Sequence, residues 1–355
     1  MKRICVAAGL GIFDLLLLFL AQHFQVVTQF YAGVIHPFLL GTFGRLFSWY
    51  PWSAGELVIY MTAVVCVVWL VRLTAKWIRK DPGRRTFLKN GIWNLILAAV
   101  IFFTLFAVAE GPNYYRPSFA EQYQVARREY TDEELLDAYE QLKRQADDLA
   151  PVVLRDADGR MQVSEDAGAE AVEAMKKLGI IYPSLGGYYP RPKPVMLSWA
   201  LSLLDITGMY TPFTMEANYN RDVVDYNQPF TMCHELSHLK GYMQEQEANF
   251  IAYLACEQSE SPEFQYSGAL LGMIYCGNEL AKRSPEIYHR VSREVSSLVR
   301  EDLDANSRYW DTYDGLLATF SHKVNDVYLK VNQQAEGVKS YDRVVDYIVQ
   351  HLNQK

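Results

Sequence analysis

One short stretch of the sequence combines residue types and spacing that could hold a metal ion. Residues 234–238 read His-Glu-Leu-Ser-His, with two histidines four positions apart and a glutamate directly after the first. On a helix, positions i and i+4 share a face, so both imidazoles can reach one ion. Zinc suits such a site because three protein ligands leave a fourth position for water, whose pKa falls to about 7. Glu235 is then predicted to act as general base toward that water.

A site of this kind needs a third protein ligand, and two glutamates shortly after the motif are candidates. Gly241 lies three residues past His238, where a turn could fold the chain back toward the ion. Glu245 and Asn249 are four positions apart in a run of helical pattern, so Glu245 can bind the metal while Asn249 orients a ligating histidine. Glu247 points elsewhere on that helix, and we prefer Glu245 as the third ligand.

Residues 230–254 resemble the zincin metallopeptidases. Their second half is similar to the gluzincin pattern, in which a Glu followed by x-x-Ala-Asp supplies the third ligand. Residues 245–249 read Glu-Gln-Glu-Ala-Asn, with Asn in the Asp place and with a shorter spacing from the second His than in typical gluzincins. The Gly after that His is similar to the metzincin motif, but Gln244 stands where that family has its third His. The resemblance implies a peptidase whose Zn2+ is held by His234, His238 and Glu245.

The layout of the whole chain resembles an uncharacterised family of bacterial membrane proteins, with three spans and an extracytoplasmic domain that carries the metal motif. This resemblance also rests on three further stretches, namely Gly111–Tyr114, Pro212–Asn218 and Val324–Lys330. It covers most of the chain, and it implies no particular substrate.

The first 109 residues contain three apolar runs long enough to cross a bilayer. These runs are residues 4–21, 55–73 and 91–109, each near the ~20 residues that span about 30 Å of hydrocarbon. The first begins after basic residues but lacks a small-residue cleavage site, so we expect an uncleaved span rather than a signal peptide. The aromatic-rich stretch between the first two spans is interpreted as an interfacial belt.

Basic residues set the expected orientation of the spans. Only Arg45 lies between the first two spans. The loop between the second and third spans and its flanks carry seven basic residues, namely Arg72, Lys76, Arg79, Lys80, Arg84, Arg85 and Lys89. By the positive-inside rule, the basic loop and Met1 are cytoplasmic. We therefore expect a multi-pass protein of the cell membrane, anchored in the lipid bilayer by residues 1–109 and with residues 110–355 outside the cytoplasm.

Composition agrees with this division. The 34 Lys and Arg against 41 Asp and Glu give a net charge of −7, which argues against a protein that binds nucleic acid. The first part is apolar and basic, and the second is polar and acidic. Five cysteines are too few for a disulfide-rich secreted scaffold, and whether Cys256 and Cys276 form a disulfide stays open.

The outer domain is expected to be α+β, mostly helical with a small β-sheet. Thr131 and Glu134 form a capping box that starts a helix, and a last amphipathic helix is predicted near residues 340–352. The helix of the metal motif is expected to begin at Asn227 as N-cap and to end at Gly241.

Residues 209–218 are predicted to be β-structure in front of the metal helix. In a zincin, the strand at this place lines the substrate groove, so it is a candidate for pairing with an extended peptide. It can equally be an ordinary sheet strand with a turn at residues 216–218.

The predicted function is that of a membrane-anchored zinc metallopeptidase that hydrolyses peptide bonds. Such an enzyme also needs a donor for the oxyanion, and Tyr341 and Arg343 are slightly preferred over His289 and His322. Two alternatives stay open: a non-catalytic module that binds a peptide or a cell-envelope ligand, and a zinc hydrolase acting on a non-peptide envelope amide. Glu235 favours the two enzymes, because a binding module needs no base there.

Overall fold

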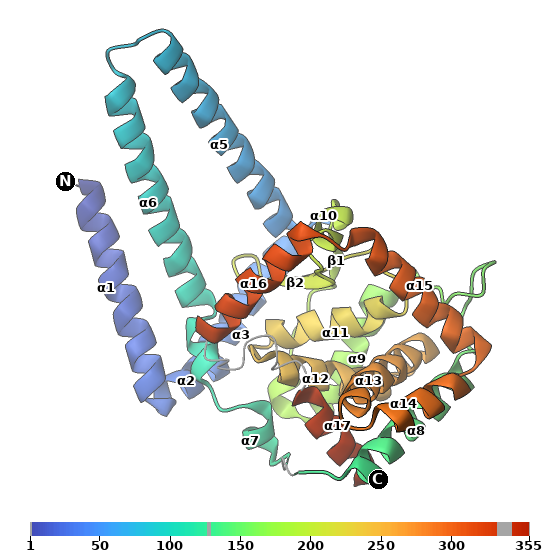
Figure 1. Ribbon diagram of the computed structural model, residues 1–355. Coiled ribbons are helices and arrows are strands. Elements are labelled where there is room, and N and C mark those ends of the chain that lie inside the picture. Colours follow the sequence, from blue (N-terminus) through green and yellow to red (C-terminus); the bar gives the residue numbers. More distant parts are fainter. Residues whose placement is uncertain (1, 126–128, 332–342, 355) are drawn as a thin grey trace. The chain divides into compact units, whose positions relative to one another are not determined.

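The computed structural model describes residues 2–125, 129–331 and 343–354, which are mostly helical and include one small sheet (Figure 1). The chain divides into two compact units. The first comprises Met1–Arg116 and Thr211–Met215, and the second comprises Pro117–Tyr210 and Glu216–Lys355. The boundary thus falls a few residues after the predicted one, and a short segment from the middle of the chain joins the first unit.

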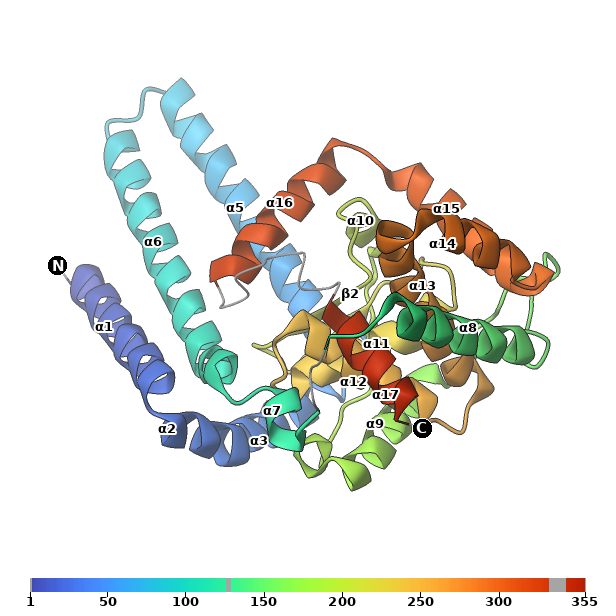
Figure 2. The same ribbon diagram turned by 60° about the horizontal axis from the view of Figure 1, so that its bottom comes forward.

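The first unit consists of helices, π-helical segments and one 3-10 turn. Its elements are α1 (Lys2–His23), α2 (Gln25–Phe30), η1 (Tyr31–Ile35), α3 (His36–Leu39), η2 (Leu40–Gly44), α4 (Arg45–Phe47), α5 (Ala54–Ile78), α6 (Arg84–Ala109) and η3 (Gly111–Tyr115). In both views α5 and α6 form a helical hairpin, and the segment from α2 onward runs across the end of α1 instead of alongside it (Figures 1 and 2).

Four described helices, rather than the three predicted, are long and apolar enough to cross a membrane. Lys2–His23, Ala54–Ile78 and Arg84–Ala109 correspond to the predicted spans, and Gln25–Phe47 is the addition. The additional helix has a mean hydropathy of 1.3, against 2.2 to 2.5 for the others, so its apolar signal is weaker. The prediction missed it because this helix is continuous only through its π-helical turns, which composition does not reveal.

Buried polar contacts hold the first unit together. Asp14 of α1 accepts a hydrogen bond of 2.8 Å from Thr104 of α6. In the additional helix, the Tyr31 hydroxyl donates to main-chain oxygens at the end of α6. His36 Nε2 lies 3.1 Å from the Glu110 carboxylate, and both side chains are buried. One face of the helix Gln25–Phe47 is therefore committed to protein contacts.

The second unit contains sixteen described elements. They are α7 (Phe119–Tyr123), α8 (Asp132–Leu149), α9 (Ala167–Ile181), η4 (Pro183–Leu185), β1 (Lys193–Pro194), α10 (Ser198–Ser202), β2 (Gly208–Thr211), β3 (Glu216–Tyr219), α11 (Asn227–Leu239), α12 (Glu245–Glu257), α13 (Pro262–Arg283), α14 (Pro285–Val291), η5 (Ser292–Glu294), α15 (Ser297–Tyr313), α16 (Leu316–Val331) and α17 (Val344–Asn353). Helix α11, with the metal motif, packs against α9, α12, α13 and β3. The capping box of Thr131 and Glu134 is present at the start of α8, as predicted.

The sheet has three strands in the order β1-β3-β2, so β2 lies at one edge. The predicted stretch 209–218 consists of two sheet strands, β2 and β3, connected by Pro212–Met215. The turn therefore lies before residues 216–218, where it was predicted, and pairing with a peptide stays a prediction. Glu216 already belongs to β3, where its carboxylate forms a buried ion pair of 2.6 Å with Lys193 of β1. This contact links β1 to the first residue of β3.

Helix α11 ends as predicted but begins differently. Gly241 has a φ of +80°, a conformation that glycine adopts without steric cost, and it follows directly after the C-cap residue Lys240. At the other end Tyr226 is the N-cap residue, and Asn227 is already in the first turn. The Asn227 side-chain amide donates to Val224 O and to Asn306 Oδ1 of α15.

Candidate metal centre

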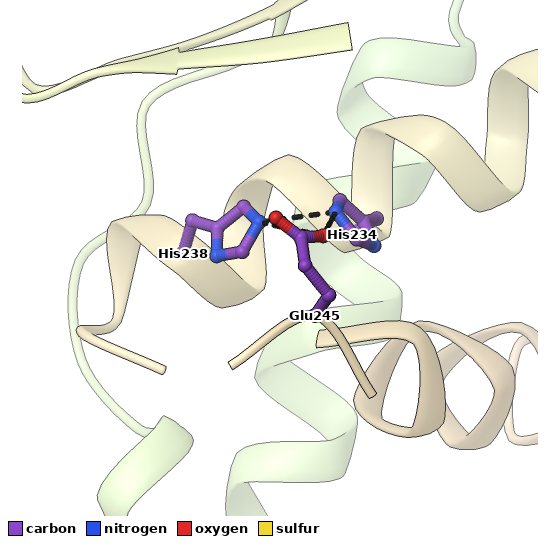
Figure 3. A group of neighbouring side chains, drawn as sticks. All are labelled: His234, His238 and Glu245. Carbon is purple, nitrogen blue, oxygen red and sulfur yellow. Dashed lines mark hydrogen bonds and ion pairs between the residues drawn. The ribbon is translucent and has the colours of Figure 1, made fainter. Parts of the chain in front are cut away.

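Three side chains from α11 and α12 converge on one point (Figure 3). The Nε2 atoms of His234 and His238 are 3.0 Å apart. Oε2 of Glu245 lies 3.2 Å from the first of these nitrogens and 3.7 Å from the second. Among the described residues, these three form the group whose possible ligand atoms all lie within 4.8 Å of one another, close enough to bind one metal ion.

These spacings fit zinc. With zinc–ligand distances of about 2.0–2.2 Å and tetrahedral angles, ligand atoms are about 3.3 Å apart. The measured 3.0, 3.2 and 3.7 Å bracket that value. The donor set of two imidazoles and one carboxylate also suits zinc and leaves a fourth position for water.

The remaining ring nitrogens are bound by the protein, which fixes how the two imidazoles face the centre. Nδ1 of His238 lies 2.8 Å from the main-chain oxygen of Tyr242. A carbonyl oxygen can only accept, so this Nδ1 carries the hydrogen and Nε2 is left as the ligand atom. Nδ1 of His234 lies 2.8 Å from Asn249 Oδ1, which has the same effect. Such partners orient metal-binding histidines and make them better ligands.

The turn between α11 and α12 brings the third side chain to the histidines. Gly241 reverses the chain after α11, and α12 begins at Glu245 itself. A carboxylate in the first turn of a helix also benefits from the positive end of the helix dipole. Asn249 follows one turn later, so the same face of α12 supplies both Glu245 and the partner of His234.

The electrostatics of the three groups favour positive charge at their centre. Burial alone would lower the pKa of His238, but the Glu245 carboxylate outweighs it and raises this pKa to about 9. Burial would likewise raise the pKa of Glu245, yet the imidazoles hold it well below its usual value. A proton or a metal ion between these groups is therefore stabilised.

Glu235 has the environment of a tuned base. Its side chain is buried, and its Oε2 has no hydrogen-bond partner within the described part of the chain. Burial, opposed only in part by the two histidines, raises the pKa of this carboxyl above its usual range. A raised pKa suits a general base, because proton transfer is most efficient when the pKa approaches the working pH.

The edge strand β2 lies directly against Glu235. The Tyr210 main-chain N–H donates to its carboxylate. A Cβ at Gly208 would stand 2.5 Å from Glu235 Oε1 and 2.6 Å from Thr231 Cγ2, so only glycine fits there. Sequence reasoning placed β-structure here but missed these two contacts and the role of the Tyr242 carbonyl, since main-chain partners leave no residue signature.

The other predicted site residues lie elsewhere or outside the described residues. The Glu247 carboxylate accepts from the Ala120 main-chain N–H of α7 at 3.4 Å, away from the group of three. Arg343 is the half-buried N-cap residue of α17, and Tyr341 lies outside the described residues. His289 contacts Arg293, and His322 pairs with Asp205. The oxyanion donor therefore stays a prediction.

The cysteines near the site are free. Cys233, which adjoins His234, is buried, as are Cys256 and Cys276. Cys256 contacts Cys233 rather than Cys276, and burial raises its thiol pKa well above the usual value. The disulfide that the sequence left open is thus not formed, and these thiols pack in the core.

Comparison with known proteins identifies a family without assigning an activity. No curated protein and no solved structure matches the chain. A family described as a protein of unknown function (DUF3810) matches residues 31–349, which include most of the additional helix Gln25–Phe47 and the group of His234, His238 and Glu245. Because this match covers most of the sequence, the chain belongs to the DUF3810 family.

Proposed function

We propose that this protein is a membrane-anchored zinc metallopeptidase, with His234, His238 and Glu245 as zinc ligands and Glu235 as general base. The observation that carries the proposal is the approach of the two Nε2 atoms to 3.0 Å while the protein binds both Nδ1 atoms. Without a cation, two such nitrogens would direct lone pairs at each other, and either a proton or a metal ion between them removes that repulsion. The carboxylate of Glu245 as a third donor atom completes a set that suits zinc.

The chain's own residues account for the proton transfers. Zinc held by the three ligands would acidify a water and polarise the scissile carbonyl. Glu235 takes a proton from the attacking water and passes it to the leaving amine. Its unpartnered Oε2 and raised pKa support this role, because that oxygen can accept a proton while the Tyr210 N–H bond holds the carboxylate in place.

Strand β2 is the proposed binding edge for an extended peptide. It lies at one edge of the described sheet and begins at Gly208, against Glu235. A peptide that adds to a sheet edge is held by main-chain hydrogen bonds, so recognition depends little on its side chains. This arrangement would present a peptide bond, rather than a compact amide, to the base.

The second unit is proposed to lie outside the cytoplasm. The basic residues around the α5–α6 loop favour a cytoplasmic position for that loop. Helix α6 then crosses the bilayer once before residue 110, so the side of the second unit is the same whether or not Gln25–Phe47 spans. The additional helix changes only the expected side of Met1.

A peptidase assay with the full-length chain in detergent tests the proposal. We expect the wild-type protein to cleave members of a quenched-fluorescence peptide library, and Glu235→Gln to lose activity by about 10²- to 10⁴-fold. Glu235 is not one of the proposed zinc ligands, and Gln has nearly the same shape as Glu. The zinc content of this variant should therefore equal that of the wild type. A full zinc complement without cleavage of any peptide would contradict the peptidase assignment and favour a binding module.

A further inference from the structure

The main-chain oxygen that orients His238 belongs to a residue outside regular structure. Tyr242 lies in the turn between α11 and α12, where residues 242–244 form neither helix nor strand. Its carbonyl accepts a hydrogen bond of 2.8 Å from His238 Nδ1. The regular hydrogen bonding of a helix does not fix the direction of this carbonyl, so the way in which the Tyr242 side chain is held becomes important.

The Tyr242 side chain is buried and held by a directed series of hydrogen bonds. It is 1% exposed, and its hydroxyl lies 2.5 Å from Ser184 Oγ and 3.2 Å from Gln122 Oε1. An amide oxygen can only accept, so the Tyr242 hydroxyl donates to Gln122 and accepts from Ser184. Ser184 Oγ accepts in turn from the Tyr123 hydroxyl at 2.7 Å. Hydrogen bonds arranged in such a series strengthen one another.

Both ends of this series lie in the short helix α7. Gln122 and Tyr123 are neighbours there, and the Gln122 amide nitrogen donates to Pro117 O at 2.6 Å, which sets the amide oxygen toward Tyr242. The Ser184 main-chain N–H also donates to the Tyr123 hydroxyl at 2.9 Å. Helix α7 therefore holds the Tyr242 hydroxyl twice, once directly and once through Ser184.

Aromatic packing joins α7 to the same turn and to α12. The Phe119 ring is 1% exposed and lies 5.4 Å from the Tyr242 ring and 6.3 Å from the Phe250 ring, edge to face in both pairs. Phe250 follows directly after Asn249, the partner of His234. Helix α7 thus contacts the residue that orients one histidine and the neighbour of the residue that orients the other.

We propose that Tyr242 is a positioning residue of the metal centre and that α7, through Ser184 and Gln122, sets the affinity of this centre for zinc. The first unit ends at Arg116, and α7 begins three residues later. A segment that adjoins the first unit in sequence thereby contributes to zinc binding without contacting the ion. The inference rests on the zinc site of the proposed function, but not on the identity of the substrate.

The zinc affinity of the full-length chain in detergent tests this role. Tyr242→Phe removes the hydroxyl and Ser184→Ala removes the link to Tyr123, while both leave the proposed ligands in place. A direct partner of a ligating histidine contributes about 10- to 100-fold in affinity, and these groups act one step further away, so we expect each variant to lose about 3- to 10-fold. Tyr266→Phe is the matched control, because this buried hydroxyl bonds Asp302 and is not part of the series.

Two further measurements distinguish positioning from a general loss of stability. With cobalt(II) in place of zinc, the visible absorption bands report the geometry of the ligands, and we expect them to shift in Tyr242→Phe but not in Tyr266→Phe. Coupling between two equilibria is reciprocal, so zinc should slow amide exchange in α7 of the wild type, and less so in Ser184→Ala.

The outcomes separate this inference from the zinc site itself. Wild-type zinc affinity and an unchanged cobalt spectrum in both Tyr242→Phe and Ser184→Ala would overturn the positioning role and leave the zinc site standing. An equal loss of affinity in Tyr266→Phe would assign the effect to folding and would also overturn the role. A wild-type chain that binds no zinc would overturn the proposed function, and this inference with it.

Discussion

Helices α5 and α11 show opposite relations between hydrophobicity and burial. In α5, 25 residues long and strongly apolar, only Gly55 and Glu56 are buried within the protein. In α11, 13 residues long and rich in polar side chains, every residue except His234 is buried. Apolar side chains thus face outward in one helix, and polar ones are enclosed in the other.

This difference in burial indicates which surroundings each helix needs to be stable. An exposed apolar helix is stable only in a non-aqueous solvent, and α5 therefore needs lipid. A buried polar helix must pair its polar groups, since each unpaired one costs about 1–3 kcal/mol. Most polar groups of α11 are paired, as Ser237 is to Cys233 O, and the Oε2 atom of Glu235 is an exception. In the proposed function, this unpaired oxygen beside the two convergent histidines is the proton acceptor.

Metal removal should have the largest effect and should affect only the second unit. Chelation is expected to abolish peptidase activity, and zinc is expected to restore it. Zinc at 100 times its Kd stabilises the folded state by about 2.7 kcal/mol, so amides of α11 and α12 should exchange faster after chelation while those of α5 and α6 do not change. Hydrogen exchange by mass spectrometry on the full chain measures both. Equal exchange of α11 with and without zinc would count against a metal centre.

Lysine substitutions at two exposed apolar positions should have the next largest effect and should distinguish helix α5 from the second unit. Val65 in the middle of α5 is 66% exposed and Ile180 of α9 is 82% exposed. Val65→Lys is expected to cost about 2.5–3.5 kcal/mol of membrane insertion, because a charge would lie in hydrocarbon. Ile180→Lys is expected to change stability by no more than about 0.5 kcal/mol. The fraction of each variant that resists carbonate extraction gives the result, and similar fractions would mean that α5 does not lie in lipid.

Asn249 tests whether the partners of the histidines matter. Asn249→Ala removes the acceptor for His234 Nδ1, and we expect zinc affinity to fall by about 10- to 100-fold. Asn249→Asp keeps an acceptor oxygen and should retain the affinity of the wild type. Competition with a chromophoric chelator measures the zinc dissociation constants of both variants. An unchanged zinc affinity in Asn249→Ala would mean that Asn249 does not contribute to zinc binding.

Gly208 should show the smallest effect, because its substitution acts on Glu235 and on Thr231 beside it rather than on the zinc ligands. Gly208→Ala forces its Cβ against Glu235 Oε1, and we expect kcat/KM to fall about tenfold, less than the ~100-fold that a 1 Å misplacement can cost. Zinc content should not change. Gly168→Ala is the matched control, since the nearest atom to its Cβ would be Pro192 O at 3.5 Å. Equal losses in the two variants would indicate a general effect on folding.

The site could be anticipated from sequence where it depends on local spacing. His234 and His238 are one turn apart, Gly241 stops the helix, and Glu245 and Asn249 are again one turn apart, so regular helices and one turn suffice to bring them together. The predicted preference for Glu245 over Glu247 followed from that periodicity, and it stays a prediction, while the Glu247 carboxylate accepts from the Ala120 main-chain N–H.

What sequence could not give depends on contacts between distant residues. Asn227 has the residue type of an N-cap, but Tyr226 holds that position, and the Asn227 amide donates to Asn306, 79 positions away. The buried ion pair between Lys193 and Glu216 likewise joins two strands that no local pattern connects. The helix Gln25–Phe47 was missed for a similar reason, because a buried partner, as Glu110 is for His36, allows polar residues in an otherwise apolar helix.

The most direct test of the central claim is the zinc content of the purified full-length chain, measured by elemental analysis beside Glu245→Gln and Glu247→Gln. Both glutamates begin α12 and both variants keep a side-chain acceptor, so they differ mainly in whether the residue lies at the histidines. We expect about one zinc per chain in the wild type and in Glu247→Gln, and little or none in Glu245→Gln. Absence of zinc from the wild type after incubation with zinc at neutral pH, or equal zinc in all three proteins, would contradict the account.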